Sequence, residues 1–72
     1  MKAYKKRMIK EYKQLNERCK KLKRILNMRD AGTLSFELNC PTWLLQDQLS
    51  AMERYRDTLL LRAEFENIDL EY

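Results

Sequence analysis

The stretch that decides the fold covers residues 3–32 and reads AYKKRMIKEYKQLNERCKKLKRILNMRDAG. Its apolar residues recur at steps of three and four, the alternation of a helix that buries one stripe along its length. The stripe positions are Tyr4, Met8, Tyr12, Leu15, Cys19, Leu22 and Leu26. We predict a helix over residues 3–29. It ends because Gly32 supplies a left-handed backbone conformation, and Arg29 favours the negative helix end.

A second helix is expected over residues 41–66, after a connector of residues 30–40. The segment has no Gly and, after Pro41, no further Pro, so nothing interrupts a helix there. Pro41 suits the first helical position, because a backbone N–H at that position has no partner within the helix and proline lacks this group. Either Asn39 or Cys40 would then cap the helix.

The end of the chain is expected to form a tail over residues 67–72, with Asn67 in the left-handed conformation that stops the second helix. Residues 1–72 are then a single domain. A core of this size rarely contributes more than about 3–5 kcal/mol, so such chains rely on disulfides, metals or self-association.

Charge is divided along the chain. Residues 1–30 carry twelve Lys and Arg against three Asp and Glu, whereas residues 31–72 carry three against eight. The two segments have net charges of +9 and −5, which sum to the formal charge of +4. A basic helix folded back on an acidic one reconciles this division with the helical periodicity. The predicted fold class is therefore all-α, an antiparallel two-helix hairpin.

The apolar arc of the second helix is wider than one partner helix can cover. The arc and its edges comprise Leu44, Leu45, Leu49, Met52, Leu59, Leu60, Leu61, Ala63 and Phe65. We therefore expect the hairpins to assemble into a helical bundle as a homo-oligomer, most simply a dimeric four-helix bundle. The alternative is that the connector and the tail cover the excess apolar surface.

Composition argues against an enzyme and against any metal or cofactor. The chain has no His, its sole Gly is the predicted helix stop, and no Ser or Cys has a plausible neighbouring base. Cys19 and Cys40 make no zinc pattern and would lie about 15 Å apart along the hairpin, too far for a disulfide. No run of about 18 apolar residues spans a membrane. We expect free thiols and a cytoplasmic location.

Three polar residues of the second helix, Gln48, Tyr55 and Arg62, are spaced by seven and stack on one face among apolar neighbours. In the antiparallel hairpin, residue i of the first helix should lie level with residue ~70 − i of the second, which brings Glu11 near Arg62. The candidate ligand-binding residues along this seam are Arg7, Glu11, Tyr12, Arg18, Gln48, Tyr55 and Arg62. Arginine binds phosphate bidentately and aromatic rings stack on bases, so the seam suits an anionic ligand that carries a ring.

The seam also has a purely structural interpretation. Arg62 and Glu11 would form a partly buried ion pair, with Tyr55 and Gln48 hydrogen-bonded across a dimer interface as devices of specificity. Trp43, in the first turn of the second helix, is interpreted as a core or interface anchor and not as a platform for a base.

A row of lysines on the first helix, including Lys6, Lys13 and Lys20, raises a nucleic-acid interpretation, because a basic helix can follow phosphates. No aromatic residue interrupts the row, and the acidic second helix would oppose DNA, so a solvated face is favoured. Membrane docking needs an exposed apolar face beside the basic one, and the second helix should cover that face. Neither nucleic acid nor a membrane is the expected partner.

Six short stretches carry a resemblance that covers nearly the whole chain: residues 7–12 (RMIKEY), 32–34 (GTL), 39–41 (NCP), 48–52 (QLSAM), 62–64 (RAE) and 68–70 (IDL). They resemble a family of small proteins of unknown function encoded by tailed bacteriophages, including crAss-like phages. Asn67 stands where a glycine would be expected. The resemblance implies an α-helical hairpin of phage origin, located in the host bacterial cytoplasm, and it brings no catalytic motif.

Phage origin favours an anti-defence function. One class of small phage proteins is similar in type: compact homo-oligomers that sequester nucleotide immune signals in basic, aromatic pockets between subunits. The leading hypothesis is a non-enzymatic protein that binds a cyclic nucleotide or an ADP-ribose-type ligand at the seam. Arg7 and Arg62 would hold phosphates. Tyr12 and Tyr55 would stack on rings, and Gln48 would read a polar edge.

Glu11 would orient the arginines in this hypothesis. Two alternatives stay open. One is a protein–protein inhibitor that docks a helical face on a host defence or replication protein, and the other is nucleic-acid binding through the basic helix.

Overall fold

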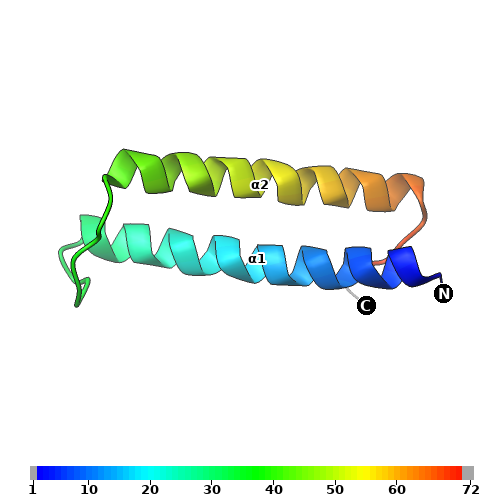
Figure 1. Cartoon of the computed structure of the whole chain (residues 1–72), viewed down its shortest axis with the longest axis horizontal. Coiled ribbons are helices and arrows are strands. Elements are labelled where there is room, and N and C mark those ends of the chain that lie inside the picture. The colour runs from blue at the N-terminus through cyan, green and yellow to red at the C-terminus, as the bar shows by residue number, and fades with distance from the viewer. Residues whose placement is uncertain (1, 71–72) are drawn as a thin grey trace.

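The computed structural model describes residues 2–70, which form two helices joined by a connector (Figure 1). Helix α1 spans Ala3–Asp30 and helix α2 spans Thr42–Phe65, so each observed end falls within one residue of its expected position. The helices pack side by side in opposite directions, in a rod of 45 × 18 × 17 Å. The residues described contain no strand, and neither helix is long and apolar enough to cross a membrane.

Helix α1 ends at a left-handed glycine. Gly32 has a φ of +74°, which lets the Thr33 N–H donate to the Met28 carbonyl at 2.8 Å and the Gly32 N–H donate to the Arg29 carbonyl at 3.1 Å. These two bonds make a Schellman motif and satisfy carbonyl groups that the helix end would leave unpaired. The predicted stop at Gly32 is confirmed.

Helix α2 ends in the same motif, with asparagine in place of glycine. Asn67 has a φ of +54°, its N–H donates to the Glu64 carbonyl at 3.3 Å, and the Ile68 N–H donates to the Ala63 carbonyl at 2.9 Å. Asparagine tolerates this conformation better than most residues that carry a Cβ. The predicted stop at Asn67 is confirmed as well.

The start of α2 differs from the expectation. Pro41 is the N-cap and not the first helical residue, because its φ of −58° and ψ of 142° keep it in an extended conformation. Its carbonyl accepts the Leu44 and Leu45 N–H groups at 3.1 and 3.4 Å. The expected cap from Asn39 or Cys40 is therefore wrong, and no side chain caps this helix.

Most of the core comes from α1. Its buried residues are Met8, Tyr12, Leu15, Cys19 and Leu26, all members of the predicted stripe. The remaining stripe positions, Tyr4 and Leu22, are half-buried. The stripe predicted from the spacing of three and four is confirmed.

Helix α2 buries much less of its apolar arc than α1 buries of its stripe. Only Leu59 and Ala63 are buried within α2, because a single partner helix covers one narrow strip of its surface. The large apolar side chains that stay exposed on α2 are Trp43, Leu44, Tyr55, Leu60, Leu61 and Phe65. Trp43 is 61% exposed, so its interpretation as a core anchor is wrong, and a role as an interface anchor stays a prediction.

The end of the chain contributes to the core. Leu70 is 5% exposed and belongs to the buried cluster, and Ile68 packs against that cluster. The left-handed turn at Asn67 returns the chain toward α1, as Figure 1 shows at the end of α2. Residues 67–70 follow α2 without helical structure and contribute Ile68 and Leu70 to the core, while residues 71–72 of the expected tail lie outside the described part.

The connector covers the end of the hairpin only in part. Leu34 and Leu38 are half-buried, whereas Phe36 is 55% exposed. Cys19 in the core and Cys40 at the end of the connector are both free thiols, as their expected separation predicted.

Truncation of Leu70 should strongly destabilise the hairpin. Leu70→Ala removes a buried side chain and is expected to cost about 2–5 kcal/mol, a large share of the stability of so small a domain. Leu61→Ala is the matched control, because Leu61 is 55% exposed; it should change the free energy of unfolding by less than about 0.5 kcal/mol. Urea denaturation followed by circular dichroism measures both. Equal effects would contradict the burial of Leu70.

The two helix stops should respond in opposite directions to substitution. Gly32→Ala should lower the free energy of unfolding by about 1–2 kcal/mol through backbone strain alone, since an added Cβ meets nothing within 4 Å. Asn67→Gly should raise it by about 0.5 kcal/mol, because glycine adopts this conformation without strain. Thermal unfolding at one protein concentration measures both changes, and a lower melting temperature for Asn67→Gly would contradict the assignment.

Candidate functional site

One hydrogen bond shows how the two helices are aligned. The Tyr55 hydroxyl on α2 donates to Oε1 of Glu11 on α1 at 2.8 Å. The expected alignment placed Tyr55 level with Leu15, one helical turn away, and brought Glu11 near Arg62. In the structure Glu11 binds Tyr55, and Arg62 binds Glu66. The expected ion pair between Glu11 and Arg62 is therefore wrong.

A second polar contact involves Arg62, which follows Tyr55 by seven residues on α2. The Arg62 Nε–H donates to Oε2 of Glu66 at 2.8 Å, and the same carboxylate raises the pKa of the Tyr4 phenol. Tyr4 precedes Glu11 by seven residues and Arg62 follows Tyr55 by seven, so Tyr4 and Arg62 lie level with each other. The charge of Arg62 acts to lower the pKa of both phenols.

Helix geometry places a third pair, Arg18 and Gln48, on the same side. Arg18 follows Glu11 by seven residues and Gln48 precedes Tyr55 by seven, which is nearly two full turns in each helix. Both side chains are exposed. The Gln48 amide has only a weak partner, the Met52 sulfur at 3.7 Å, so it is free to bind a ligand.

These three pairs form what we call the ladder: Tyr4 with Arg62, Glu11 with Tyr55, and Arg18 with Gln48. Successive pairs are about 10.5 Å apart along the rod, the rise of seven helical residues. The ladder offers two guanidinium groups, two phenols and an amide along one side of the hairpin. Such a set can bind an elongated anion that carries rings and phosphates.

The carboxylates of the ladder region raise the pKa values of its phenols. The hydrogen bond to Glu11, then partial desolvation and the Glu11 charge, raise the pKa of Tyr55, and Arg62 opposes them. Glu66 acts in the same way on the pKa of Tyr4. Desolvation acts to raise the pKa of Glu66, but hydrogen bonds from Tyr4 and Arg62 and nearby positive charges outweigh it and lower that pKa. Glu66 is therefore a carboxylate that holds Arg62.

Two of the predicted site residues are not members of the ladder. Tyr12 is 7% exposed and belongs to the core, so its ring is not available for stacking on a ligand. Arg7 is exposed one turn before Glu11 on α1, at the edge of the ladder. Tyr4 is the aromatic residue that sequence reasoning missed. The signal was present, because Tyr4, Glu11 and Arg18 repeat the spacing of seven found in the second helix.

Three surface hollows lie away from the ladder. One of about 480 Å³ lies at the connector, one of about 490 Å³ lies on the outer side of α2, and one of about 400 Å³ lies among basic residues near the end of α1. None of the three is lined by a ladder residue. Within residues 2–70, no group of three or more His, Cys, Asp or Glu side chains could hold a metal ion.

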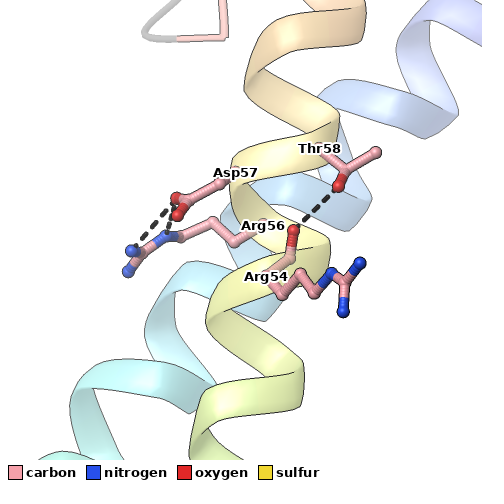
Figure 2. A network of polar contacts seen from close by, with 4 residues as sticks. All are labelled: Arg54, Arg56, Asp57 and Thr58. Carbon is pink, nitrogen blue, oxygen red and sulfur yellow. Dashed lines mark hydrogen bonds and ion pairs between the residues drawn. The ribbon is translucent and has the colours of Figure 1, made fainter.

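Two local contacts lie within α2, one on either side of the helix in Figure 2. The Arg56 guanidinium pairs with Asp57 at 3.2 Å, and the Thr58 hydroxyl donates to the Arg54 carbonyl one turn earlier at 2.9 Å. The hydroxyl of Thr58 is thus satisfied within its own helix.

Comparison with known proteins gives one finding. A protein-family model described as Sequestin matches residues 2–65, which includes all of α1 and α2. No curated protein and no solved structure matches the chain.

The Tyr55 phenol should titrate above its ordinary pKa of 10.0, because the hydrogen bond to Glu11 and the Glu11 charge favour its neutral form. The stability that this bond contributes is present below pH 10.0 and is lost as the pH rises above that value. Glu11→Gln should bring the pKa back toward 10.0, while Glu17→Gln, an exposed position on α1, should not. NMR titration of the tyrosine ring carbons measures the shift. An unchanged pKa in Glu11→Gln would contradict the contact.

Proposed function

The chain belongs to the Sequestin family, and we propose that it is a non-enzymatic phage anti-defence protein that binds and sequesters a small anionic nucleotide immune signal. The family name refers to sequestration, which requires tight binding and no chemical step. In this proposal the protein acts as a homo-oligomer in the host bacterial cytoplasm, and its ligand is a cyclic nucleotide or an ADP-ribose-type molecule. The observation that carries the proposal is the ladder.

Phosphate binding is assigned to the arginines of the ladder. Arg62 uses its Nε–H for Glu66, which fixes the plane of the guanidinium and leaves the four N–H groups of its two terminal nitrogens for a ligand. A fixed guanidinium binds phosphate with less loss of side-chain entropy than a free one. Glu66 therefore has the orienting role that the sequence assigned to Glu11, and Arg18 provides the second cation.

Ring binding is assigned to the phenols. Tyr55 is 44% exposed although its hydroxyl is held by Glu11, so its ring has a fixed position and still reaches solvent. Stacking of one base on such a ring contributes about 1–3 kcal/mol. Gln48, at the far end of the ladder, offers an amide that can read a polar edge of the base.

The exposed position of the ladder supports the proposed homo-oligomer. The ladder lies on the open side of a two-helix rod, and none of the three hollows coincides with it. Binding sites for small molecules usually bury about 70–90% of the ligand surface. A second copy placed over the ladder would supply the missing wall.

The alternative function is that of a protein–protein inhibitor. The exposed apolar side chains on the outer side of α2 favour it. Trp43 and Leu61 are 61% and 55% exposed there, and eighteen residues separate them, which is five helical turns and the same face. Exposed aromatic side chains are typical anchors of protein interfaces. Trp43→Ala should abolish capture of a host protein if this function holds, and should leave ligand binding by the ladder unchanged.

Calorimetry with a panel of cyclic nucleotides and ADP-ribose derivatives tests the proposal. At least one compound should bind the wild type, and Arg62→Gln should weaken its binding by about ten-fold or more, because a charge-assisted phosphate contact is lost. Arg54→Gln is the matched control. It removes the same charge from the same helix away from the ladder, and it should keep the wild-type affinity.

Two results would reject the proposal. One is the absence of binding by every compound at protein concentrations that support the oligomer. The other is an equal loss of affinity in Arg62→Gln and Arg54→Gln, which would show that net charge, and not the ladder, governs binding.

A further inference from the structure

A second stripe runs along α2, separate from the residues that face the core. Its members are all exposed, and they follow one another at steps of four and three: Leu44, Gln48, Ala51, Tyr55, Thr58, Arg62 and Phe65. This is the spacing by which one helix packs against another along a seam. Leu44 and Phe65, at its ends, are 46% and 81% exposed, so the hairpin leaves much of both side chains uncovered.

The stripe has the same pattern of side-chain sizes when it is read from either end. A large apolar residue stands at each end, a long polar residue comes next, a small residue follows, and Tyr55 lies in the middle. When the stripes of two copies run in opposite directions, Leu44 of one copy faces Phe65 of the other. In the same way Gln48 faces Arg62, and Ala51 faces Thr58. Such a self-complementary surface is what a two-fold symmetric interface requires.

We propose that this stripe packs in antiparallel orientation against the same stripe of a second copy, about a two-fold axis at Tyr55, so that Arg62 of each copy completes the ligand site of the other. The antiparallel orientation keeps the two Arg62 side chains about 21 Å apart along the helix axis. That distance is well beyond the screening length of about 8–10 Å, whereas a parallel orientation would stack the two cations on each other.

The small residues of the stripe are suited to burial by a partner. Ala51 has no polar side-chain atom, and the Thr58 hydroxyl already donates to the Arg54 carbonyl at 2.9 Å (Figure 2). Covering Thr58 therefore leaves no unsatisfied donor. Seven side chains from each copy make a small interface, so the dimer should form in a concentration-dependent way.

The two-fold axis relates opposite ends of the ladder. It places the Tyr4 and Arg62 pair of one copy over the Arg18 and Gln48 pair of the other. Two guanidinium groups and an amide then meet at each of two equivalent positions, with cations contributed by both copies. This assignment rests on the proposed function, whereas the helix pairing itself does not.

Disulfide formation between two single-cysteine variants tests the helix pairing without any ligand. In a Cys40→Ser background, Leu44→Cys and Phe65→Cys are prepared separately, since both positions are exposed and lie outside the core. The antiparallel pairing brings residue 44 of one copy next to residue 65 of the other, within the short Cα distance that a disulfide needs. Neither variant alone should cross-link, and their mixture should give a covalent dimer on mild oxidation.

A cross-link that either variant forms with itself overturns the pairing. Cross-linking of Leu44→Cys with itself indicates a parallel orientation. If neither variant nor the mixture cross-links, the same experiment with Ala51→Cys and Thr58→Cys, which keep the apolar ends intact, decides. A second failure shows that the stripe is not a self-interface. The background protein, with only buried Cys19, should not cross-link.

Mixing two binding-deficient variants tests the shared site. Arg18→Gln and Arg62→Gln should each lose ligand affinity by about ten-fold or more on their own. In a mixed dimer, one of the two sites retains both wild-type arginines, so the equilibrated mixture should regain about a quarter of the wild-type sites at wild-type affinity. If the wild type binds and the mixture regains nothing, the site lies within one copy and the inference is wrong. If the wild type binds no compound, the proposed function fails, and the cross-links still decide the pairing.

Discussion

The antiparallel packing of α1 on α2 at a single alignment is the constraint on which the rest of the structure depends. Both helices repeat their side chains on one face every seven residues, so the contact between Glu11 and Tyr55 at 2.8 Å also decides what lies one repeat away in either direction. The same alignment brings Tyr4 level with Arg62 and Arg18 level with Gln48. A shift of one turn would keep an apolar core and would separate all three pairs.

The two helices contribute unequally to stability and to surface chemistry. Helix α1 buries five side chains and exposes its cations, whereas α2 buries only Leu59 and Ala63 within its span and leaves six large apolar or aromatic side chains in solvent. A domain of 72 residues cannot bury enough surface by itself to be highly stable. The helix that contributes less to the core is therefore the one with a surface suited to a second copy.

Electrostatics assigns different tasks to the two acidic residues of the ladder region. Glu11 fixes the ring of Tyr55 through the phenolic hydroxyl, whereas Glu66 holds Arg62 and raises the pKa of Tyr4. Neither removes the basic character of this side, because Arg7 and Arg18 are also exposed there. The result is a row of rings and guanidinium groups in which the protein's own carboxylates hold Tyr55 and Arg62 in place.

The sequence by itself determined the two helices, the buried stripe of α1 and the left-handed stops at Gly32 and Asn67, because each depends on local spacing or on a single backbone conformation. Repeats of seven likewise marked Gln48, Tyr55 and Arg62 as one face. Only the tertiary structure decided that Glu11 binds Tyr55, that Tyr4 at the end of the stripe stays half-buried, and that Leu70 returns to the core. Those facts depend on how far the connector offsets one helix against the other and on the path of the chain after Asn67. An offset of one turn preserves the same apolar pattern, so the pattern cannot distinguish the alternatives.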